Sequence, residues 1–374
     1  MISRRAHPLE PQSPSNGWAF ASVLALLGIA LASEYLIPRD EKRSPEPPPS
    51  PHTTEQTVNA EGRGRRATAP SEIPARGWKD ILLRVYSNIS KHRILALAAG
   101  MTYYSILAIF PAIAALVAVY GLFSDPSTIA RHLDQLGGFL PSGAIDVARE
   151  QLTRVGSKGS QTLGLTFLVG LGVSLWSANA AMKSLFDTLN IVHNEEEKRG
   201  FVKLNAISLS FTVGGVLFVV AAIGSIVVVP LILNYAGFSD WGDLLLRTGR
   251  WPAMFLTLTF ALAIIYRYGA SREAPRWRWI TWGSAIAALV WLIVSGLFSW
   301  YATNFGKFNE TYGSLGAVVG FMTWLWISAI VILLGAEIDA EMEHQTAQDT
   351  TTGLPKPMGA RGARMADTVG AAQG

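Results

Sequence analysis

The sequence contains no cysteine among its 374 residues. Disulfide bonds, thiolate zinc sites, iron–sulfur clusters and cysteine nucleophiles are therefore excluded. Charge is also scarce: only 16% of the residues are Asp, Glu, Lys or Arg, whereas a soluble globular protein carries about a quarter. Half of the residues are hydrophobic, and the twelve tryptophans suit a protein with two membrane interfaces.

Recognisable enzyme motifs are missing as well. The six histidines never lie within five residues of one another, so the sequence has no HExxH motif and no paired-histidine metal site. It also lacks a GxSxG nucleophile motif and a phosphate-binding P-loop. The sequence therefore predicts no catalytic residues, no metal site, no bound cofactor and no ATP-driven activity.

Long apolar runs are abundant. A helix needs about 20 apolar residues to cross the hydrocarbon core. Seven runs approach or exceed that length: Trp18–Ile37, Ile94–Phe123, Thr162–Met182, Leu204–Tyr235, Trp251–Tyr268, Ile280–Tyr301 and Ser314–Ala336. Because lipid cannot satisfy backbone hydrogen bonds, these runs must be helices. We expect an all-α polytopic membrane protein with a six-helix core and one extra N-terminal span.

Composition divides the chain into four parts. Residues 1–37 hold the first span, although Trp18–Ala30 also resembles the apolar region of a signal peptide. Residues 38–77 form a basic, Pro-rich linker that we expect to be disordered, because it has too few apolar residues to offset its ordering entropy. Residues 78–343 form the membrane core. Residues 344–374, rich in Gly and Ala, are expected to be a disordered tail.

The basic residues give an orientation. If residues 38–93 are cytoplasmic, the loops on that side hold 22 Lys and Arg, and those on the other side hold 7. The positive-inside rule then places both ends of the core in the cytoplasm. Arg63, Arg65 and Arg66 lack interleaved aromatic residues, so we expect them to contact anionic inner-leaflet lipids rather than nucleic acid.

Two segments outside the spans have amphipathic patterns. Trp78, Leu82, Val85 and Ile89 share one helical face, which predicts a short helix on the membrane surface. In the loop 124–160, spaced apolar residues suggest two further amphipathic helices. They would lie on the outer surface or fold back into the core.

The third run ends in a polar stripe. Its members share one helical face: Asn179, Lys183, Asp187 and Asn190. One interpretation is a helix that enters the cytoplasmic interface, where Lys183 extends to water. The other is a stripe that lines a cavity between helices.

The last run ends in LLGAEIDAE, which places Glu337, Asp339 and Glu341 at the exit from the membrane. A helix C-terminus disfavours an anion. Either these acids are solvated beyond the membrane edge, or Glu337 meets a cation from another helix. Lys183 and Arg267 end their spans on the same side and are the expected partners.

Three segments carry a family resemblance: LAAGMTYYSILAIFPAIAAL, WSANAAMKSLFDTLNIV and FGKFNETYGSLGAVVGFMTWLWISAIVILLGAEIDAE. With their spacing, they resemble the YihY/BrkB family of bacterial inner-membrane proteins over about residues 78–343. The resemblance implies a six-helix core in the bacterial inner membrane. Members of the family have carried a ribonuclease BN label or a link to serum resistance and virulence. The residues that match the family pattern are Tyr103, Pro111, Asn190, Tyr312, Gly313, Gly335 and Glu337.

Proline and glycine mark further positions in these segments. Pro111 is expected to interrupt its span, as a packing kink or an exposed site. Gly313, Gly316 and Gly320 form a seam for close helix packing.

Three functions remain. The sequence favours a passive or ion-coupled transporter of a small solute or lipid-related compound. Its path would be formed by Asn179, Lys183, Asp187, Asn190, Glu337 and Tyr103. The alternative is a non-transporting envelope or scaffold protein that uses the basic linker. A ribonuclease is disfavoured, because no metal cluster or acid–base pair at a wet site is visible.

Overall fold

The computed structural model describes residues 62–123, 160–235, 239–304 and 316–373. Within these ranges the chain is helical, and the β-structure is one isolated bridge between Pro275 and Thr351. The helices are η1 (Pro70–Glu72), α3 (Ala75–Lys91), α4 (Ile94–Phe123), α7 (Ser160–Val192), α8 (Phe201–Tyr235), α9 (Ser239–Tyr268), α10 (Trp277–Asn304), α12 (Gly316–Gln345) and α13 (Arg364–Asp367). The predicted all-α fold class is therefore confirmed.

Several predictions concern other parts of the chain. The first span in residues 1–37, the linker up to residue 61 and the amphipathic helices in the loop 124–160 lie outside the described residues. Tyr312 and Gly313 lie outside them too. The described part of α4 is continuous, so the backbone stays helical at Pro111, where the sequence predicted an interruption.

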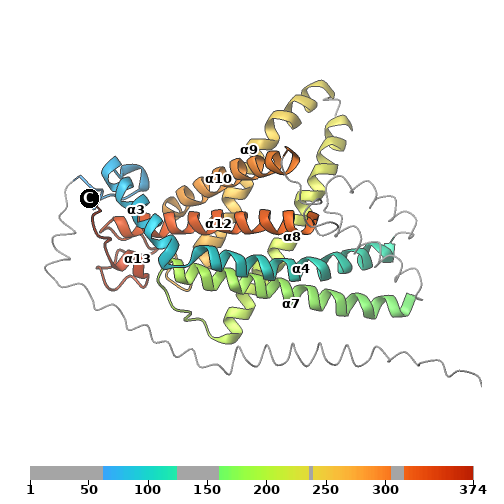
Figure 1. The fold of residues 1–374 in the computed structure, drawn as a ribbon, viewed down its shortest axis with the longest axis horizontal. Coiled ribbons are helices and arrows are strands. Elements are labelled where there is room, and N and C mark those ends of the chain that lie inside the picture. The colour runs from blue at the N-terminus through green and yellow to red at the C-terminus, as the bar shows by residue number, and fades with distance from the viewer. Residues whose placement is uncertain (1–61, 124–159, 236–238, 305–315, 374) are drawn as a thin grey trace, which may run out of the picture. The chain divides into compact units, whose positions relative to one another are not determined.

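Helix α12 is central among the described helices. It contacts α3, α4, α7 and α10 (Figure 1). Helix α4 packs along α7, α10 packs against both α9 and α12, and α8 contacts α7 and α9. The end of α12 is thus the place where segments far apart in sequence converge.

Four segments of the described residues are long and apolar enough to cross a membrane: Phe201–Phe218, Trp251–Tyr268, Trp277–Ala302 and Val318–Gln345. A shorter apolar stretch, Ile94–Ala108, belongs to α4. Large apolar side chains are exposed along these helices, as at Leu217, Phe260 and Leu297. Exposed apolar surface of this extent is expected of helices that face lipid. The total of six core spans plus one stays a prediction.

Helix α3 buries its predicted apolar face only in part, and it buries polar side chains beside it. The sequence predicted that Val85 and the apolar residues on its face would lie on the membrane surface. In the structure Val85 is buried in the protein. Asp80, Arg84 and Asn88 are buried beside it, while Leu82 is 55% exposed. The side of α3 that faces the protein is therefore part apolar and part polar, and its Arg84 and Asn88 bond the acids of α12.

Residues 62–73 and 346–373 pack together over the end of α12, and we call this unit the terminal cap. Arg65 donates to the carbonyl oxygens of Gln345 and Gly370 at 3.0 and 2.6 Å. Arg361 donates to those of Ala347 and Ala366 at 2.7 and 2.6 Å. These parts of the linker and the tail are ordered in the structure, unlike the expectation from composition. Composition counts apolar residues and misses buried arginines whose hydrogen bonds order a chain of low hydropathy.

Two glycines allow α12 to approach its neighbours. A Cβ atom at Gly335 would lie 2.4 Å from the Cβ of Ala287 and 2.6 Å from the hydroxyl oxygen of Tyr266. A Cβ atom at Gly283 of α10 would lie 2.1 Å from Oδ1 of Asp339. A larger side chain at Gly335 would push against α9 and α10, and one at Gly283 would displace the Asp339 carboxylate. Gly316 begins α12 and Gly320 is half-buried one turn later.

Candidate functional site

Four acidic residues on the last turns of α12 are buried. Glu337 and Glu343 have no exposed surface, and Asp339 and Glu341 are 1% and 2% exposed. The interpretation of Glu337, Asp339 and Glu341 as solvated acids is therefore wrong. Because the acids stand at every second position, Glu337 and Glu341 point to one side of the helix and Asp339 and Glu343 to the other. Each side holds a different set of partners.

On the first side, α12 faces α3 through paired polar side chains that we call the α3–α12 polar row. Its members on α3 and its C-cap are Arg84, Asn88 and His92, and those on α12 are Glu337, Glu341 and Gln345. Asn88 Nδ2 donates to Glu341 at 2.9 Å and to Glu337 at 3.3 Å. Arg84 pairs with Glu341 through Nε and donates to Gln345 Oε1 at 2.6 Å through Nη2. The two helices run antiparallel. Because the polar residues recur every four positions on both helices, each of these residues of α3 meets a partner on α12.

The pair formed by His92 and Glu337 is the innermost member of this row. His92 is the C-cap of α3, at the corner where the chain turns into α4, and is 3% exposed. Its Nδ1 bonds Oε1 of Glu337, while its Nε2 is buried without a hydrogen-bond partner. Imidazole and carboxylate can both gain and lose protons. The pair is therefore a buried contact between two acid–base side chains.

On the second side, α12 is tied to the start of α10 and to the loop before it. Asp339 Oδ1 accepts a hydrogen bond from the Gly283 amide at 3.0 Å, and its Oδ2 is buried without a partner. Arg272 binds Glu343 through two bonds of 2.8 and 2.9 Å. Thr350 of the terminal cap donates to the same carboxylate at 3.1 Å. All four acids thus act between segments rather than toward water.

The expected cation partners of Glu337 are not the ones found. Arg267 is 8% exposed, donates to the carbonyl oxygen of Pro275 and lies 4.6 Å from the ring centroid of Trp277. Arg267 therefore stabilises the connection between α9 and α10 and does not bind Glu337. Lys183 is half-buried on α7. His92 and Asn88 occupy the place that the sequence assigned to Lys183 or Arg267.

The residues of the polar stripe on α7 lie in different surroundings. Asn190 is buried and accepts a hydrogen bond from the Ser271 amide at 2.6 Å, while its Nδ2 donates to Glu197 at 3.1 Å. Asp187 is exposed, and Asn179 is half-buried. Tyr103 is 61% exposed on α4, with its ring against that of Tyr104. Of these path candidates, the structure places only Glu337 within the α3–α12 polar row.

Sequence reasoning overlooked the residues on α3 that complete the site. Asp80, Arg84, Asn88 and His92 recur every four residues, and so do Glu337, Glu341 and Gln345. Two polar stripes of the same period can pair along antiparallel helices. The shared spacing could therefore have predicted that the two polar stripes pair. The apolar pattern of α3 does not indicate it.

The loop after α7 offers a prediction on pH. Burial alone would raise the pKa of Glu197, but hydrogen bonds from Arg199 and Asn190 outweigh it and lower the pKa to about 2. The ionised Glu197 therefore stabilises the folded protein fully at pH values above its ordinary pKa of 4.5. This stabilisation is lost as the pH falls toward 2. We expect Glu197→Gln to lower the thermal midpoint in detergent at pH 7, with the deficit shrinking below pH 4. A deficit that is equal at all pH values would contradict this account.

Long apolar helices with lipid-facing side chains, and charged groups enclosed at the helix ends, define a polytopic α-helical membrane protein. Comparison with known proteins narrows this class. The chain belongs to the Virulence factor BrkB family, whose profile matches residues 85–358. The resemblance found in the sequence is thereby confirmed.

Similar proteins come from several bacteria. Ribonuclease-like protein YfkH of Bacillus subtilis is 26% identical over 69% of this chain and 94% of its own length. A UPF0761 membrane protein of Haemophilus influenzae is 21% identical over 71% of this chain and 96% of its own. A UPF0761 membrane protein of Neisseria meningitidis is 26% identical over 70% of this chain and 62% of its own length. No solved structure matches the chain.

Proposed function

We propose that this protein is a passive or ion-coupled transporter of a small solute or lipid-related compound in the bacterial inner membrane. Both ends of its core would face the cytoplasm, as the distribution of Lys and Arg favours. The observation that carries the proposal is the buried pair of His92 and Glu337 at the end of α12. In this orientation the pair lies at the cytoplasmic end of the helices.

The physical argument concerns cost. Burying an ion pair removes both groups from water, and well-packed apolar residues could hold two helices together as well or better. Stability alone is therefore a weak reason to place imidazole and carboxylate at a buried membrane position. A reversible change of charge there alters the contact between α3 and α12, which is what coupling to a proton requires.

The test uses a strain without the gene, complemented by wild type or by Glu337→Gln, and compares solutes and lipids inside and outside the cells. Glutamine keeps the shape of the side chain and removes its charge. We expect wild type to restore the level of one compound or lipid class and Glu337→Gln to fail at equal protein abundance. Full complementation by Glu337→Gln would refute a transport role for this residue.

Asp339→Asn is the matched control. Asp339 is also buried on α12, two residues away, but faces α10, and asparagine can still accept the hydrogen bond from Gly283. We expect this variant to complement. If both variants fail while remaining folded, the acids of α12 act together as a structural unit and the specific role of Glu337 is wrong.

A non-transporting scaffold that uses the basic linker is the second candidate. The observation that favours it is the terminal cap, because the cap holds the end of that linker in a defined position. Because Arg63 and Arg65 are part of the folded unit, a truncation must stop before them. Deleting residues 1–61 should abolish a scaffold function that depends on the linker and should leave transport largely intact. The described residues contain no group of three or more His, Cys, Asp or Glu that could hold a metal ion.

A further inference from the structure

The N-terminal half of α3 borders a cation-lined cavity. Its volume is about 280 Å³, and it is lined by Arg63, Arg76, Lys79, Asp80 and Gln373. Three of these side chains are basic and one is acidic, so the lining carries a net positive charge. The size is close to the lower end of ligand sites, which measure roughly 300–1,000 Å³.

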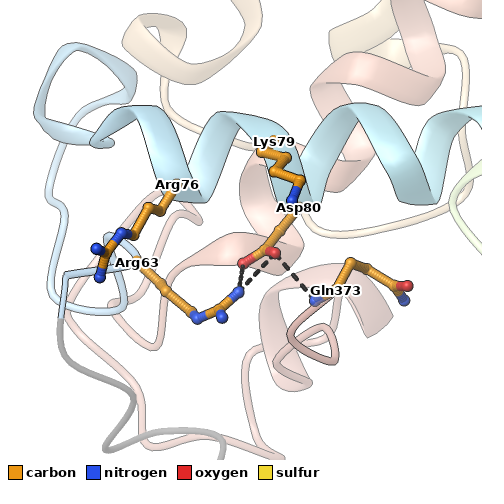
Figure 2. Close-up of a pocket in the computed structure, with 5 residues that line it drawn as sticks. All are labelled: Arg63, Arg76, Lys79, Asp80 and Gln373. Atoms are coloured by element: carbon orange, nitrogen blue, oxygen red, sulfur yellow. Dashed lines mark hydrogen bonds and ion pairs between the residues drawn. The ribbon is translucent and has the colours of Figure 1, made fainter.

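The acidic residue is already paired with a basic one, as Figure 2 shows. Arg63 donates to both carboxylate oxygens of Asp80 at 2.7 and 2.8 Å, and the backbone N–H of Gln373 donates to Oδ1 at 2.9 Å. Burial would raise the pKa of Asp80, but these hydrogen bonds outweigh it and lower the pKa, so the residue stays ionised. Asp80 therefore fixes Arg63 in place, while Arg76 and Lys79 add positive charge at exposed positions.

The start of α3 adds further positive potential. The helix is 17 residues long, and its N-cap, Pro74, makes no side-chain capping hydrogen bond. Its first turn contains no acidic residue that would offset the positive end of the helix dipole. The cavity thus combines basic side chains with a helix N-terminus, an arrangement that favours phosphate groups.

The same helix continues into an exposed apolar surface. Leu82, Leu83 and Tyr86 are 55%, 43% and 77% exposed. Leu83 and Tyr86 follow Lys79 at spacings of four and seven residues, so they extend the same helical face beyond the basic residues. A free phosphate ion would match the basic cavity but not the apolar surface beside it. An anionic phospholipid matches both parts, with its phosphate at the basic residues and its acyl chains along the apolar surface.

We propose that the N-terminal half of α3, with Arg63, is a binding site for one anionic phospholipid. The site lies apart from the pair of His92 and Glu337, so it stands whether or not the protein transports. It also changes which basic residues contact lipid. Arg65, expected from sequence to contact the leaflet, is 3% exposed and serves the terminal cap, whereas Arg76 and Lys79 are accessible.

The experiment uses the full chain purified in a neutral detergent and titrated with phosphatidylglycerol or phosphatidylcholine, with bound lipid counted by native mass spectrometry. The variant is Arg76→Gln/Lys79→Gln, which leaves the bond between Arg63 and Asp80 intact. We expect wild type to retain phosphatidylglycerol selectively and the variant to bind it about 25-fold more weakly, since each basic residue near a lipid surface contributes about a factor of five. The matched control, Arg278→Gln/Lys356→Gln, removes two exposed charges outside α3 and should bind like wild type.

Two further arms separate a lipid from a free anion. Leu83→Asn/Tyr86→Asn should weaken phosphatidylglycerol binding without touching a basic residue. Millimolar inorganic phosphate should not displace the lipid. Displacement by phosphate, unchanged lipid binding in Arg76→Gln/Lys79→Gln, or equal loss in the control would each overturn the proposal.

Discussion

Replacing Glu341 with leucine is expected to destabilise the protein by about 3–5 kcal/mol, because it leaves a buried arginine without its counterion. Arg84 is 7% exposed and pairs with Glu341 inside the α3–α12 polar row. Its other partners, Gln345 and the carbonyl oxygen of Ala371, are neutral and cannot balance the charge. The free energy of unfolding would be measured by denaturant titration of the protein in detergent.

The double variant Arg84→Met/Glu341→Leu tests the cause. It removes both charges, so no unpaired ion remains, and the loss should be clearly smaller than in Glu341→Leu alone. Lys198→Gln serves as the control, because Lys198 is 58% exposed in its pair with Glu195 and should contribute about 1 kcal/mol or less. If the double variant is as unstable as Glu341→Leu, shape rather than charge governs this contact.

Gly335→Ala is the second substitution with a large expected effect. The added methyl group would overlap Ala287 of α10 and the hydroxyl group of Tyr266 on α9. Tyr266 cannot turn away freely, since it is fully buried and donates to the carbonyl oxygen of Ile332 at 2.6 Å. We expect a loss of about 1–3 kcal/mol, or a loss of folded protein, as is usual for overpacking.

The compensating change is Ala287→Gly, which removes the atom nearest to the new methyl group. In the background of Gly335→Ala it should recover part of the thermal midpoint. Gly296→Ala on α10 is the control: its added Cβ meets no atom within 4 Å, and alanine favours a helix over glycine by about 1 kcal/mol. A neutral result for Gly335→Ala would show that α9, α10 and α12 are less closely packed than described.

The membrane helices illustrate what a sequence can show directly. A run such as Trp251–Tyr268 must be helical in lipid whatever its neighbours are, because its backbone has no other hydrogen-bond partners. The family motif around Gly335 and Glu337 is likewise local, and the match over residues 85–358 agrees with it. Neither required any knowledge of which helices meet.

The partners of the acids on α12 could not be found in this way. Lys183 and Arg267 were expected to meet Glu337 because they end their spans on the same side. His92 reaches it because the corner between α3 and α4 lies against the end of α12. Choosing among these candidates depends on helix positions that differ by a few ångströms, and hydropathy carries no such detail.

The terminal cap makes the same point for segments of low hydropathy. Arg65 and Arg361 resemble the solvated charges of a disordered chain. Arg65 donates to carbonyl oxygens of the distant C-terminal segment, and Arg361 donates to carbonyl oxygens within its own tail. By itself the sequence determined an all-α membrane protein of the BrkB family with acids at the end of its last helix. Only the tertiary structure decided that those acids are buried, and which basic groups face them. Lipid imposes helices one segment at a time, whereas a buried charge is satisfied only by a partner that folding brings near.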